Sequence, residues 1–487
     1  MSLVAADPAI GTRHRPLAVA ALFLAAFMNI LDVTIVNLAL PAIRTELTAT
    51  TTQLEWVLVV YVLTFAAGLL PFGRFGDAFG RKRVFCAGVA GFLGSSVVCG
   101  FAPDIQTLIA ARAVQGLAAS MMIPQVLAIV HVIFSAKEKG KVIGLFGTVN
   151  ALGAVAGPLL GGLLITANIA GLGWRPIFLM NVPLCVLSLF VAMRFLPRIE
   201  VSARTRPDWA GALLFAAAIV CLIYPLTEGR HLGWPWWCFG LFGLAAAFAL
   251  FFVQTQMQQA RQGLPQILPA KLITDSAFMR GLAVVTAFFS GIAGIHFMLA
   301  IVLQSGFGMT PLQAGLATAP HPVGVMIAST LTGRLGNRWL EIRTVFGGGL
   351  LLAGMVWVRS ILGQNSADMT SADLFLPMLG VGLGMGTAIA AMFQAVLIRV
   401  SPADAGAESG VLQAAQQVGI AVGIGIVGQI FFATLDPSES RTDYVRAAQT
   451  ALLFPVGIYL LLVITGIWNV YENKRSRHEA ERKPVTR

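Results

Sequence analysis

Long apolar stretches separated by short polar turns make up most of this sequence, beginning at Leu17. A helix that crosses a bilayer needs about 20 predominantly apolar residues. The glycines and prolines inside several stretches are compatible with membrane helices. We therefore expect fourteen membrane-spanning helices, at 17–40, 54–72, 84–102, 105–131, 141–166, 176–196, 209–227, 235–255, 280–304, 312–333, 343–362, 374–398, 409–434 and 449–470.

Composition supports a membrane protein. Of the 487 residues, 57% are hydrophobic and 11% are charged, whereas soluble domains carry about 25% charged residues. The five cysteines lie in apolar stretches without C-x-x-C spacing, so we expect packing residues and no metal site. No phosphate-binding loop is present, so we expect no ATP, no cofactor and no enzyme. We also expect no cleavable signal peptide before the first stretch.

The formal charge of +11 could indicate nucleic acid, but the positions of the basic residues indicate topology instead. With both termini in the cytoplasm, 26 of the 33 lysines and arginines fall in cytoplasmic segments and 5 in outer loops. Cytoplasmic loops of membrane proteins carry such an excess. We therefore predict a multi-pass protein of the cytoplasmic (inner) membrane with both termini cytoplasmic, and no nucleic-acid partner.

Two short basic turns, 73–83 and 333–338, resemble each other and follow the second and tenth stretches. They indicate a duplicated six-helix unit, with the seventh and eighth stretches as an inserted pair. Two related halves with a site between them form a common transporter plan. We predict a first half at 1–200, an inserted helix pair and linker at 201–265, a second half at 266–472, and a charged cytoplasmic tail at 473–487. Residues 472–487 are expected to be disordered.

The turn at 73–83 carries an ordered set of residues, Gly73, Asp77, Gly80 and Arg81. Glycine permits a tight turn, and Asp77 can cap a helix or hold an arginine. The alternative is an ordinary basic loop. The ordered spacing exceeds what that rule requires, so we predict that this turn fixes how the second and third helices meet.

Asp32 lies inside the first apolar stretch, where an ionisable group costs about 2.5–3.5 kcal/mol to insert. The helical rise places Asp32 roughly 6 Å and Arg112 roughly 9 Å beyond the midpoints of their spans, toward the same membrane face. Asp32 is the only carboxylate that the predicted limits place well inside a span. We predict a buried pair in which Asp32 carries a proton and Arg112 modulates it. A static pair that fixes helix register, or an Asp32 that reaches interfacial water, is the alternative.

The fifth stretch places Gly153, Gly157 and Gly161 at four-residue spacing, with Pro158 among them. Glycines at this spacing leave one helix face without side chains, so a partner helix can approach closely. Pro158 removes one backbone donor and permits a kink. The spacing alone predicts a tight helix contact.

The 73–83 turn resembles the signature between spans 2 and 3 of the major facilitator superfamily. Gly73, Asp77, Gly80 and Arg81 match that signature, and Ala78 departs from it, because a basic residue is common there. The match implies a latch on the inner side. The second copy carries Asn337 where an acid would stand.

Other motifs resemble the same family. The R-x-x-Q-G run Arg112–Gly116 resembles its span-4 motif, which is associated with proton transfer, and 31–41 resembles the span-1 motif of its fourteen-span drug:proton antiporters. The G-x-x-x-G-P-x-x-G-G run 153–162 resembles the antiporter motif of its drug exporters, in which the glycine face would seal the two halves against leak. The resemblance covers nearly the whole chain. It implies an all-α membrane protein of the major facilitator fold, with two six-helix halves and two inserted helices.

Several other polar residues fall within the spans. His296 lies at the position that mirrors Asp32 in the duplicated half, and we include it with Asp32 and Arg112 as a proton-coupling candidate. A packing histidine is the alternative. Candidates for a substrate cavity, which could equally bridge helices or fill the core, are Asn29, Tyr61, Gln115, Met121, Asn150, Gln304 and His321.

These observations predict a proton-coupled exporter of small amphipathic, drug-like compounds, driven by the proton gradient and working by alternating access. Its expected partners are the lipid bilayer, its substrate and protons, with a periplasmic adaptor left open for a Gram-negative host. The alternatives are a dedicated exporter of one metabolite, natural product or lipid, and a membrane sensor or scaffold on a transporter fold.

Overall fold

A computed structural model describes residues 15–134, 136–197, 208–264, 266–333, 335, 339–364, 369–397, 405–436 and 438–482. Every regular element in these residues is a helix. The first half comprises α1 (Arg15–Glu46), α2 (Thr51–Phe79), α3 (Arg81–Gly100), α4 (Ile105–Ile133), α5 (Ala136–Ala167), η1 (Ile169–Gly171), α6 (Pro176–Leu179) and α7 (Asn181–Phe195). The inserted pair is α8 (Trp209–Glu228) and α9 (Trp236–Arg261).

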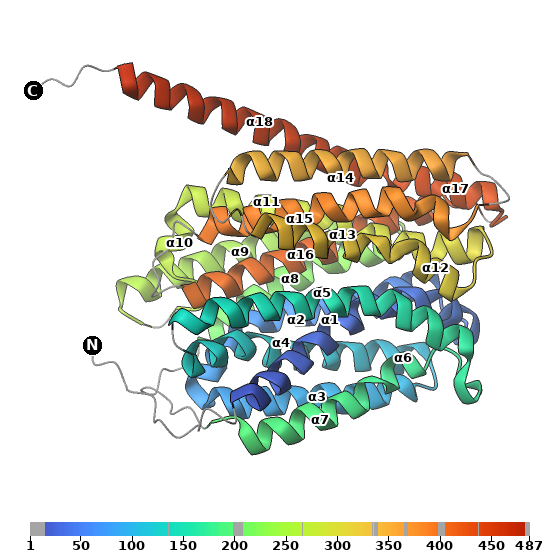
Figure 1. The fold of residues 1–487 in the computed structure, drawn as a ribbon, viewed down its shortest axis with the longest axis horizontal. Helices are drawn as coiled ribbons and strands as arrows, with labels where there is room; N and C mark the ends of the chain where they lie inside the picture. The colour runs from blue at the N-terminus through green and yellow to red at the C-terminus, as the bar shows by residue number, and fades with distance from the viewer. Residues whose placement is uncertain are drawn as a thin grey trace, which may run out of the picture.

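The second half follows the short helix α10 (Ala270–Thr274). It comprises α11 (Ser276–Ile301), the π-helical turn η2 (Val302–Gly306), α12 (Pro311–Thr318), α13 (Pro320–Gly333), α14 (Leu340–Gly363), η3 (Ser371–Leu374), α15 (Phe375–Leu397), α16 (Ala405–Thr434), α17 (Arg441–Ala451) and α18 (Leu453–Arg482). Figure 1 shows the long helices lying side by side, with α1 beginning and α18 ending at the same end of the bundle. We call this the proximal end and the opposite one the distal end.

Thirteen helices within the described residues are long and apolar enough to cross a membrane. The predicted span at 312–333 is not among them, because the helix breaks at Ala319 into α12 and α13. Pro320 and Pro322 follow this break, and proline removes a backbone donor and clashes with the preceding turn. Counted as one broken span, α12 and α13 complete the fourteen, and the predicted fold class is confirmed.

The helices of the two halves pack in the same pairs. Contacts between α1 and α5, α2 and α4, α3 and α4, α3 and α7, and α1 and α7 recur as α11 with α16, α13 with α15, α14 with α15, α14 with α18, and α11 with α18. Across the halves, α2 packs on α16, and α5 packs on α12 and α13. The helix α8 contacts both α2 and α16, so the inserted pair touches both halves. α11 is therefore the counterpart of α1, and α16 that of α5.

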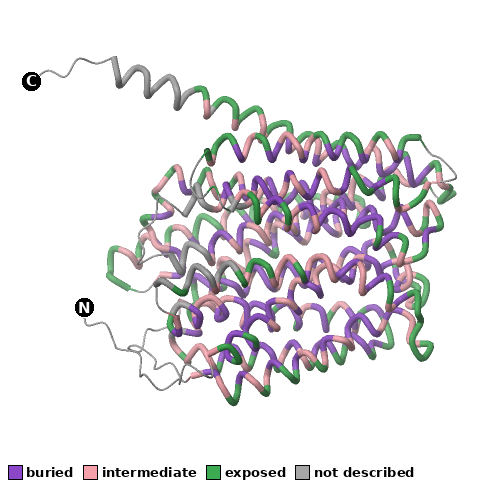
Figure 2. Tube along the Cα trace, viewed as in Figure 1, coloured by how far each residue is buried: buried purple, intermediate pink, exposed green. Residues whose placement is uncertain are grey.

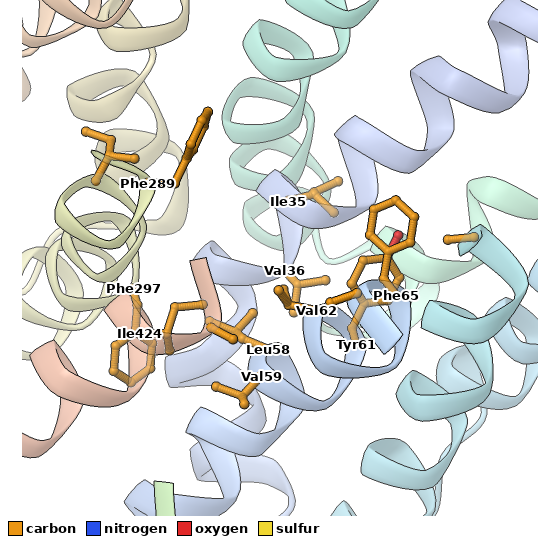
Figure 3. Packing of buried hydrophobic residues seen from close by; sticks show 14 of the residues in the cluster. Ile35, Val36, Leu58, Val59, Tyr61, Val62, Phe65, Phe289, Phe297 and Ile424 are labelled. Carbon is orange, nitrogen blue, oxygen red and sulfur yellow. The ribbon is translucent and has the colours of Figure 1, made fainter. Parts of the chain in front are cut away.

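Burial follows this arrangement. Figure 2 shows buried residues concentrated on the inward faces of the helices, with exposed residues on the outside of the bundle. Large apolar side chains are exposed there, among them Phe190, Leu213 and Trp236. An outward apolar surface of this kind suits a lipid environment. Figure 3 shows the core where the halves meet, with Leu58 of α2 close to Ile424 of α16 and Phe297 of α11.

Two predicted boundaries were wrong. α2 continues to Phe79, so Gly73 and Asp77 lie in its last turns, and the turn itself is at Gly80, which has a φ of 95°. The tail predicted to be disordered continues α18 as a helix to Arg482. Its run of Glu, Lys, Arg and Ala consists of good helix formers, which outweigh its lack of apolar residues.

Candidate functional site

A buried polar cluster occupies the centre of the first half. The Asp32 carboxylate on α1 and the Arg112 guanidinium on α4 lie 2.5 Å apart, and their side chains are 0% and 1% exposed. A nitrogen–oxygen contact this short is a charge-assisted hydrogen bond. The pair that the sequence predicted from membrane depth is therefore formed.

Further hydrogen bonds engage both oxygens of the Asp32 carboxylate. Its Oδ2 accepts from Arg112, while its Oδ1 accepts from the amides of Gln115 and Asn181, each at 3.1 Å. Gln115 accepts from Arg112 at 2.7 Å and donates to Ser96 at 2.9 Å. A buried charge that is paired and fully hydrogen-bonded is tolerated inside a protein, whereas an isolated one is not.

Sequence spacing explains part of this geometry. Arg112 and Gln115 are three residues apart on α4 and so project from the same helix face. Gly116 comes next, and a Cβ there would lie 2.3 Å from the backbone oxygen of Tyr61 on α2. The glycine of the R-x-x-Q-G run therefore lets α4 lie against α2, where the Nε of Arg112 donates to the carbonyl of Val57 at 3.0 Å.

A cavity of about 270 Å³ lies between the two halves. From the first half it is lined by α1, α2, α4 and α5, including Asn29, Tyr61 and Arg112; from the second half it is lined by α11, α12, α13, α15 and α16, including His296 and His321. The hydroxyl of Tyr61 donates to Asn29 at 2.7 Å, and the Arg112 guanidinium lies 4.2 Å from the centre of the Tyr61 ring. Arg112 thus contacts the cavity on one side and Asp32 on the other.

Four predicted cavity residues lie outside this lining. Gln115 belongs to the Asp32 cluster, and Asn150 is half-buried on α5. Met121 lies where α4 meets α3, beside Gly88. Gln304, in the π-helical turn η2, donates to the Leu38 carbonyl of α1 at 3.1 Å and so joins the two halves.

The glycine face of α5 packs against α1 of its own half. A Cβ at Gly157 would lie 1.9 Å from the Thr34 hydroxyl, one at Gly161 would lie 2.6 Å from Ile35, and one at Gly153 would lie 3.0 Å from the Phe27 carbonyl. The three glycines therefore contact their own half, and the role of this motif in sealing the halves against leak stays a prediction.

The contact between the halves falls on the neighbouring side of α5. The carbonyl of Pro158 lies 2.4 Å from where a Cβ at Gly315 of α12 would stand, and a Cβ at Gly162 would lie 2.7 Å from Leu312. In the second half, α16 repeats the close approach to α11, because a Cβ at Gly419 or Gly423 would meet backbone oxygens of α11.

The distal ends of the halves are joined by an ion pair between Arg44 of α1 and Glu439, which precedes α17, at 2.7 Å. Tyr444 also donates to Glu439 at 2.9 Å. The hydrogen bond from Arg44 holds the pKa of the Glu439 carboxyl below its usual value. Thr166 of α5 accepts from the backbone of Leu312 at 3.2 Å at the same end.

At the proximal end, the predicted latch is only partly described. Gly80 makes the turn between α2 and α3, and Arg81 begins α3. The side chain of Asp77 lies outside the described residues. Gly76 allows close contact with Gln125 of α4, whose amide donates to the Phe72 carbonyl at 2.9 Å.

The sequence analysis did not single out Glu55, a second buried acid of the first half. Glu55 of α2 is 3% exposed, and its Oε2 has no hydrogen-bond partner among the described residues. A Cβ at Gly428 of α16 would lie 2.6 Å from it, so it sits where α2 meets α16. The predicted span began at Leu54, which made Glu55 look like an end residue; a helix starting at the Thr50 capping box would have placed it one turn inside.

Comparisons with known proteins agree with this architecture. The family model described as Major Facilitator Superfamily matches residues 22–295. The probable actinorhodin transporter of Streptomyces coelicolor is 37% identical over 431 residues, which cover 88% of this chain and 75% of that protein. The methylenomycin A resistance protein of Streptomyces coelicolor is 31% identical over 477 residues, with 96% of each chain covered.

Solved structures show the same fold. The POT family transporter PepTSo superposes with a TM-score of 0.68 at 14% identity, covering 96% of this chain and 99% of that one. An auto-inhibited POT family peptide transporter gives a TM-score of 0.67 at 17% identity, with 94% and 96% covered.

Proposed function

This chain belongs to the major facilitator superfamily, and we propose that it exports amphipathic, drug-like compounds in exchange for protons by alternating access between its halves. Two of its relatives, the probable actinorhodin transporter and the methylenomycin A resistance protein, are named for transport of a compound and for resistance to one, which supports efflux. The protein is then a secondary transporter that uses the proton gradient and needs neither ATP nor a bound cofactor.

The observation that carries the proposal is the position of Arg112. Its guanidinium lines the cavity, whereas Asp32 does not, and the two are hydrogen-bonded. A compound in the cavity therefore acts on Asp32 through Arg112. Removing one partner of a buried ion pair leaves an uncompensated charge and costs about 3–5 kcal/mol. Movement of Arg112 away from Asp32 therefore strongly favours protonation of the Asp32 carboxylate.

The transport cycle follows from this coupling. When the distal end opens, Asp32 takes a proton and releases Arg112 toward the cavity. When the proximal end opens, Asp32 loses the proton and Arg112 returns to the carboxylate and to Gln115. A compound that enters from the proximal side binds near Tyr61 and Arg112 in the form in which Asp32 has lost its proton. It leaves when the distal end opens and Asp32 is protonated again, so the compound and the proton exclude each other. Binding of a compound is coupled to protonation of Asp32 only if the compound binds the protonated and deprotonated states with different affinities.

Inside-out vesicles test the proposal directly. Energised vesicles that contain the protein should take up substrate against its gradient and, in a pH-dye assay, lose part of their proton gradient when substrate is added. An empty-vector membrane is the control. Uptake that survives collapse of the proton gradient and follows ATP instead would contradict the proposal.

A dedicated exporter of one compound is the second candidate. The relatives reported above are named for single antibiotics, and about 270 Å³ lies just below the usual 300–1,000 Å³ of drug-sized sites. A panel of chemically unrelated compounds separates the two, because a multidrug exporter responds to several of them and a dedicated one to a single scaffold. A sensor or scaffold on this fold would respond to none.

We place the protein in the inner membrane with both termini in the cytoplasm, so the proximal end faces inward. Single cysteines at positions 79 and 438, in a cysteine-free background, test this orientation. In intact cells, an impermeant thiol reagent should label position 438 and leave position 79 unlabelled. The reverse pattern would invert the topology.

A further inference from the structure

The second half contributes a short chain of side chains to the cavity wall. His296 of α11, His321 of α13 and Met385 of α15 all line the cavity. The Nε2 of His296 lies 3.2 Å from the Nδ1 of His321, and the Nε2 of His321 lies 3.2 Å from the Met385 sulfur. At its other end, the Nδ1 of His296 lies 3.3 Å from the carbonyl of Ile292.

The partners fix where the hydrogens lie in neutral rings. A carbonyl only accepts, so the Nδ1 of His296 carries the hydrogen and its Nε2 is an acceptor. The Nδ1 of His321 must then donate to it, which leaves the Nε2 of His321 with a lone pair. The thioether of Met385 is not a donor, so this nitrogen carries no hydrogen and lies beside the Met385 sulfur in the cavity wall.

This arrangement is not a metal site. The two contacts of His321 use its two different ring nitrogens, so His296, His321 and Met385 form a line and do not converge on one point. The described residues contain no group of three His, Cys, Asp or Glu side chains that could hold a metal.

Charge in the cavity favours an acidic ligand. No carboxylate lines the cavity in the part of the chain that the structure describes, and both oxygens of Asp32 are engaged behind the wall. The titratable lining residues are Tyr61 of α2, Arg112 of α4, His296 and His321. The lining residues of α1, α5, α12, α15 and α16 are apolar or neutral polar side chains.

We infer that the cavity binds aromatic, amphipathic compounds that carry an acidic hydroxyl or carboxylic acid, and that the Nε2 of His321 receives the proton of that group. The ligand O–H bond breaks, a proton joins the lone pair of His321, and the imidazolium donates its new N–H to the ligand oxygen. When the ligand arrives ionised, His321 takes up one proton from water and the imidazolium then donates to the ligand oxygen. The flexible side chain of Met385 moves aside, and Arg112 provides a second positive charge.

This inference deepens the proposed function by naming its substrate class. Phe289, Ile292 and Ile420 give the same cavity an apolar wall for the ring system. A lipophilic cation of similar size meets Arg112 and the open imidazole, with no free carboxylate to balance it. The cavity therefore discriminates by charge more than by shape.

Calorimetry on the purified, full-length protein in lipid nanodiscs tests the inference. The probes are naphthoic acid, its methyl ester and naphthylmethylamine, which share a ring system and differ in charge. We expect the acid to bind about tenfold or more tightly than the ester, and the amine to bind most weakly. Titrations at neutral pH in buffers of different ionisation enthalpy should show uptake of about one proton per bound acid and none for the ester.

The variants H321N and H321Q should lose the proton uptake and the preference for the acid, with ester binding unchanged within about twofold. H231N is the matched control, because His231 is exposed in the turn after α8, and it should behave as wild type. Should both His321 variants fail to fold, the wild-type comparison of acid, ester and amine still decides. An amine that binds as tightly as the acid, or full proton uptake in H321N, would overturn the inference.

The measurement separates this inference from the proposed function, because it uses no membrane gradient. A preference for the acid in a protein that drives no proton exchange would refute coupled export alone. Coupled export of cations, with no preference for the acid, would refute the acidic-ligand site alone.

Discussion

Asp32 of α1 and His296 of α11 lie on corresponding helices of the two halves, but their surroundings differ. Asp32 is completely buried, and both of its oxygens are hydrogen-bonded within its own half. His296 lines the cavity and begins a chain that runs through His321 to the Met385 sulfur. One half therefore holds a charged cluster behind the cavity wall, and the other presents histidines in the wall itself.

The difference assigns different tasks to duplicated helices. A buried ion pair has two distinct arrangements, paired and separated, and so suits a switch between states. An uncharged histidine chain at the cavity surface can accept a proton from whatever occupies the cavity, which suits recognition. Arg112 connects the two, because it alone among the charged residues described touches both the cavity and Asp32. We propose that coupling belongs to the first half and ligand selection to the second.

Neutralising Asp32 tests this division most severely. Asp32→Asn mimics the protonated acid, so we expect proton-driven export to fall by about 100-fold or more, with binding of the methyl ester probe retained. Asp32→Glu, which keeps the charge, should retain part of the activity. The readout is substrate-dependent proton flux in inside-out vesicles.

The division between halves fails if the order of effects is reversed. His296→Asn should alter which compounds bind and leave proton coupling of a neutral substrate in place. Proton-dependent accumulation in Asp32→Asn, together with loss of coupling in His296→Asn, would move the proton carrier to the second half.

The second-largest effect on export is expected at Gly157, where α5 lies directly against α1. A Cβ at Gly157 would lie 1.9 Å from the Thr34 hydroxyl, which is itself bonded to two carbonyls of α1. α1 must therefore shift, and Asp32 with it. We expect Gly157→Ala to insert normally, to lose about 1–3 kcal/mol of stability, and to lose roughly tenfold in export.

Gly147 on the same helix provides the control, because a Cβ there has no atom within 4 Å. Gly147→Ala should match the wild type in melting temperature and in vesicle transport. If Gly157→Ala and Gly147→Ala change stability and transport equally, the position of the added methyl group on α5 does not matter. The contact between Gly157 and α1 would then have no special role.

Hydrophobic pattern and depth predicted much of this molecule. The spans, the duplication and the Asp32–Arg112 pair all follow from one-dimensional information, since charge and length determine depth in a membrane. Spacing on one helix also brings Gln115 beside Arg112. The break at Ala319 could have been read from Pro320 and Pro322.

Contacts between distant helices were not accessible in this way. Asn181 and Ser96 reach the Asp32 cluster because of how α7 and α3 are rotated, which sequence depth does not specify. His296 and His321 were both identified, but their pairing depends on how α11 and α13 pack. The glycine face of α5 was correct as a contact surface, yet the partner helix was not encoded in its spacing.

Glu55 sharpens the comparison, because it is buried without the partners that Asp32 has. Burial alone would make it a second proton carrier. It does not line the cavity, and no contact links it to Arg112 among the described residues. We therefore expect Glu55→Gln to leave coupled export within about threefold of wild type, measured in the same vesicles as Asp32→Asn. A loss as large as that of Asp32→Asn would extend the coupling site to the interface of α2 and α16.

The smallest effect is expected where the halves meet at the distal end, at the ion pair of Arg44 and Glu439. The pKa of Glu439 is lowered by Arg44, so the pair stabilises the closed distal end above the usual pKa of a glutamate, and this contribution is lost as pH falls through the lowered value. The two side chains are 32% and 42% exposed, which limits the pair to about 0.2–1 kcal/mol. A single cysteine at position 48, beside this pair, should therefore react with an impermeant thiol reagent up to about fivefold faster in Glu439→Gln at neutral pH.

Acid and salt should narrow the same difference. At a pH below the lowered pKa of Glu439, the wild type and Glu439→Gln should react equally fast, because the side chain at position 439 is then uncharged in both. High salt should have a similar, weaker effect by screening an exposed pair. Asp104→Asn is the matched control, since the pKa of Asp104 is also lowered, but by Thr107 within its own half, and that variant should leave labelling at position 48 unchanged. A labelling rate in Glu439→Gln that equals the wild-type rate at neutral pH would show that the distal closure rests on the uncharged contacts of Gln304 and Thr166, and that the two halves are held together without this ion pair.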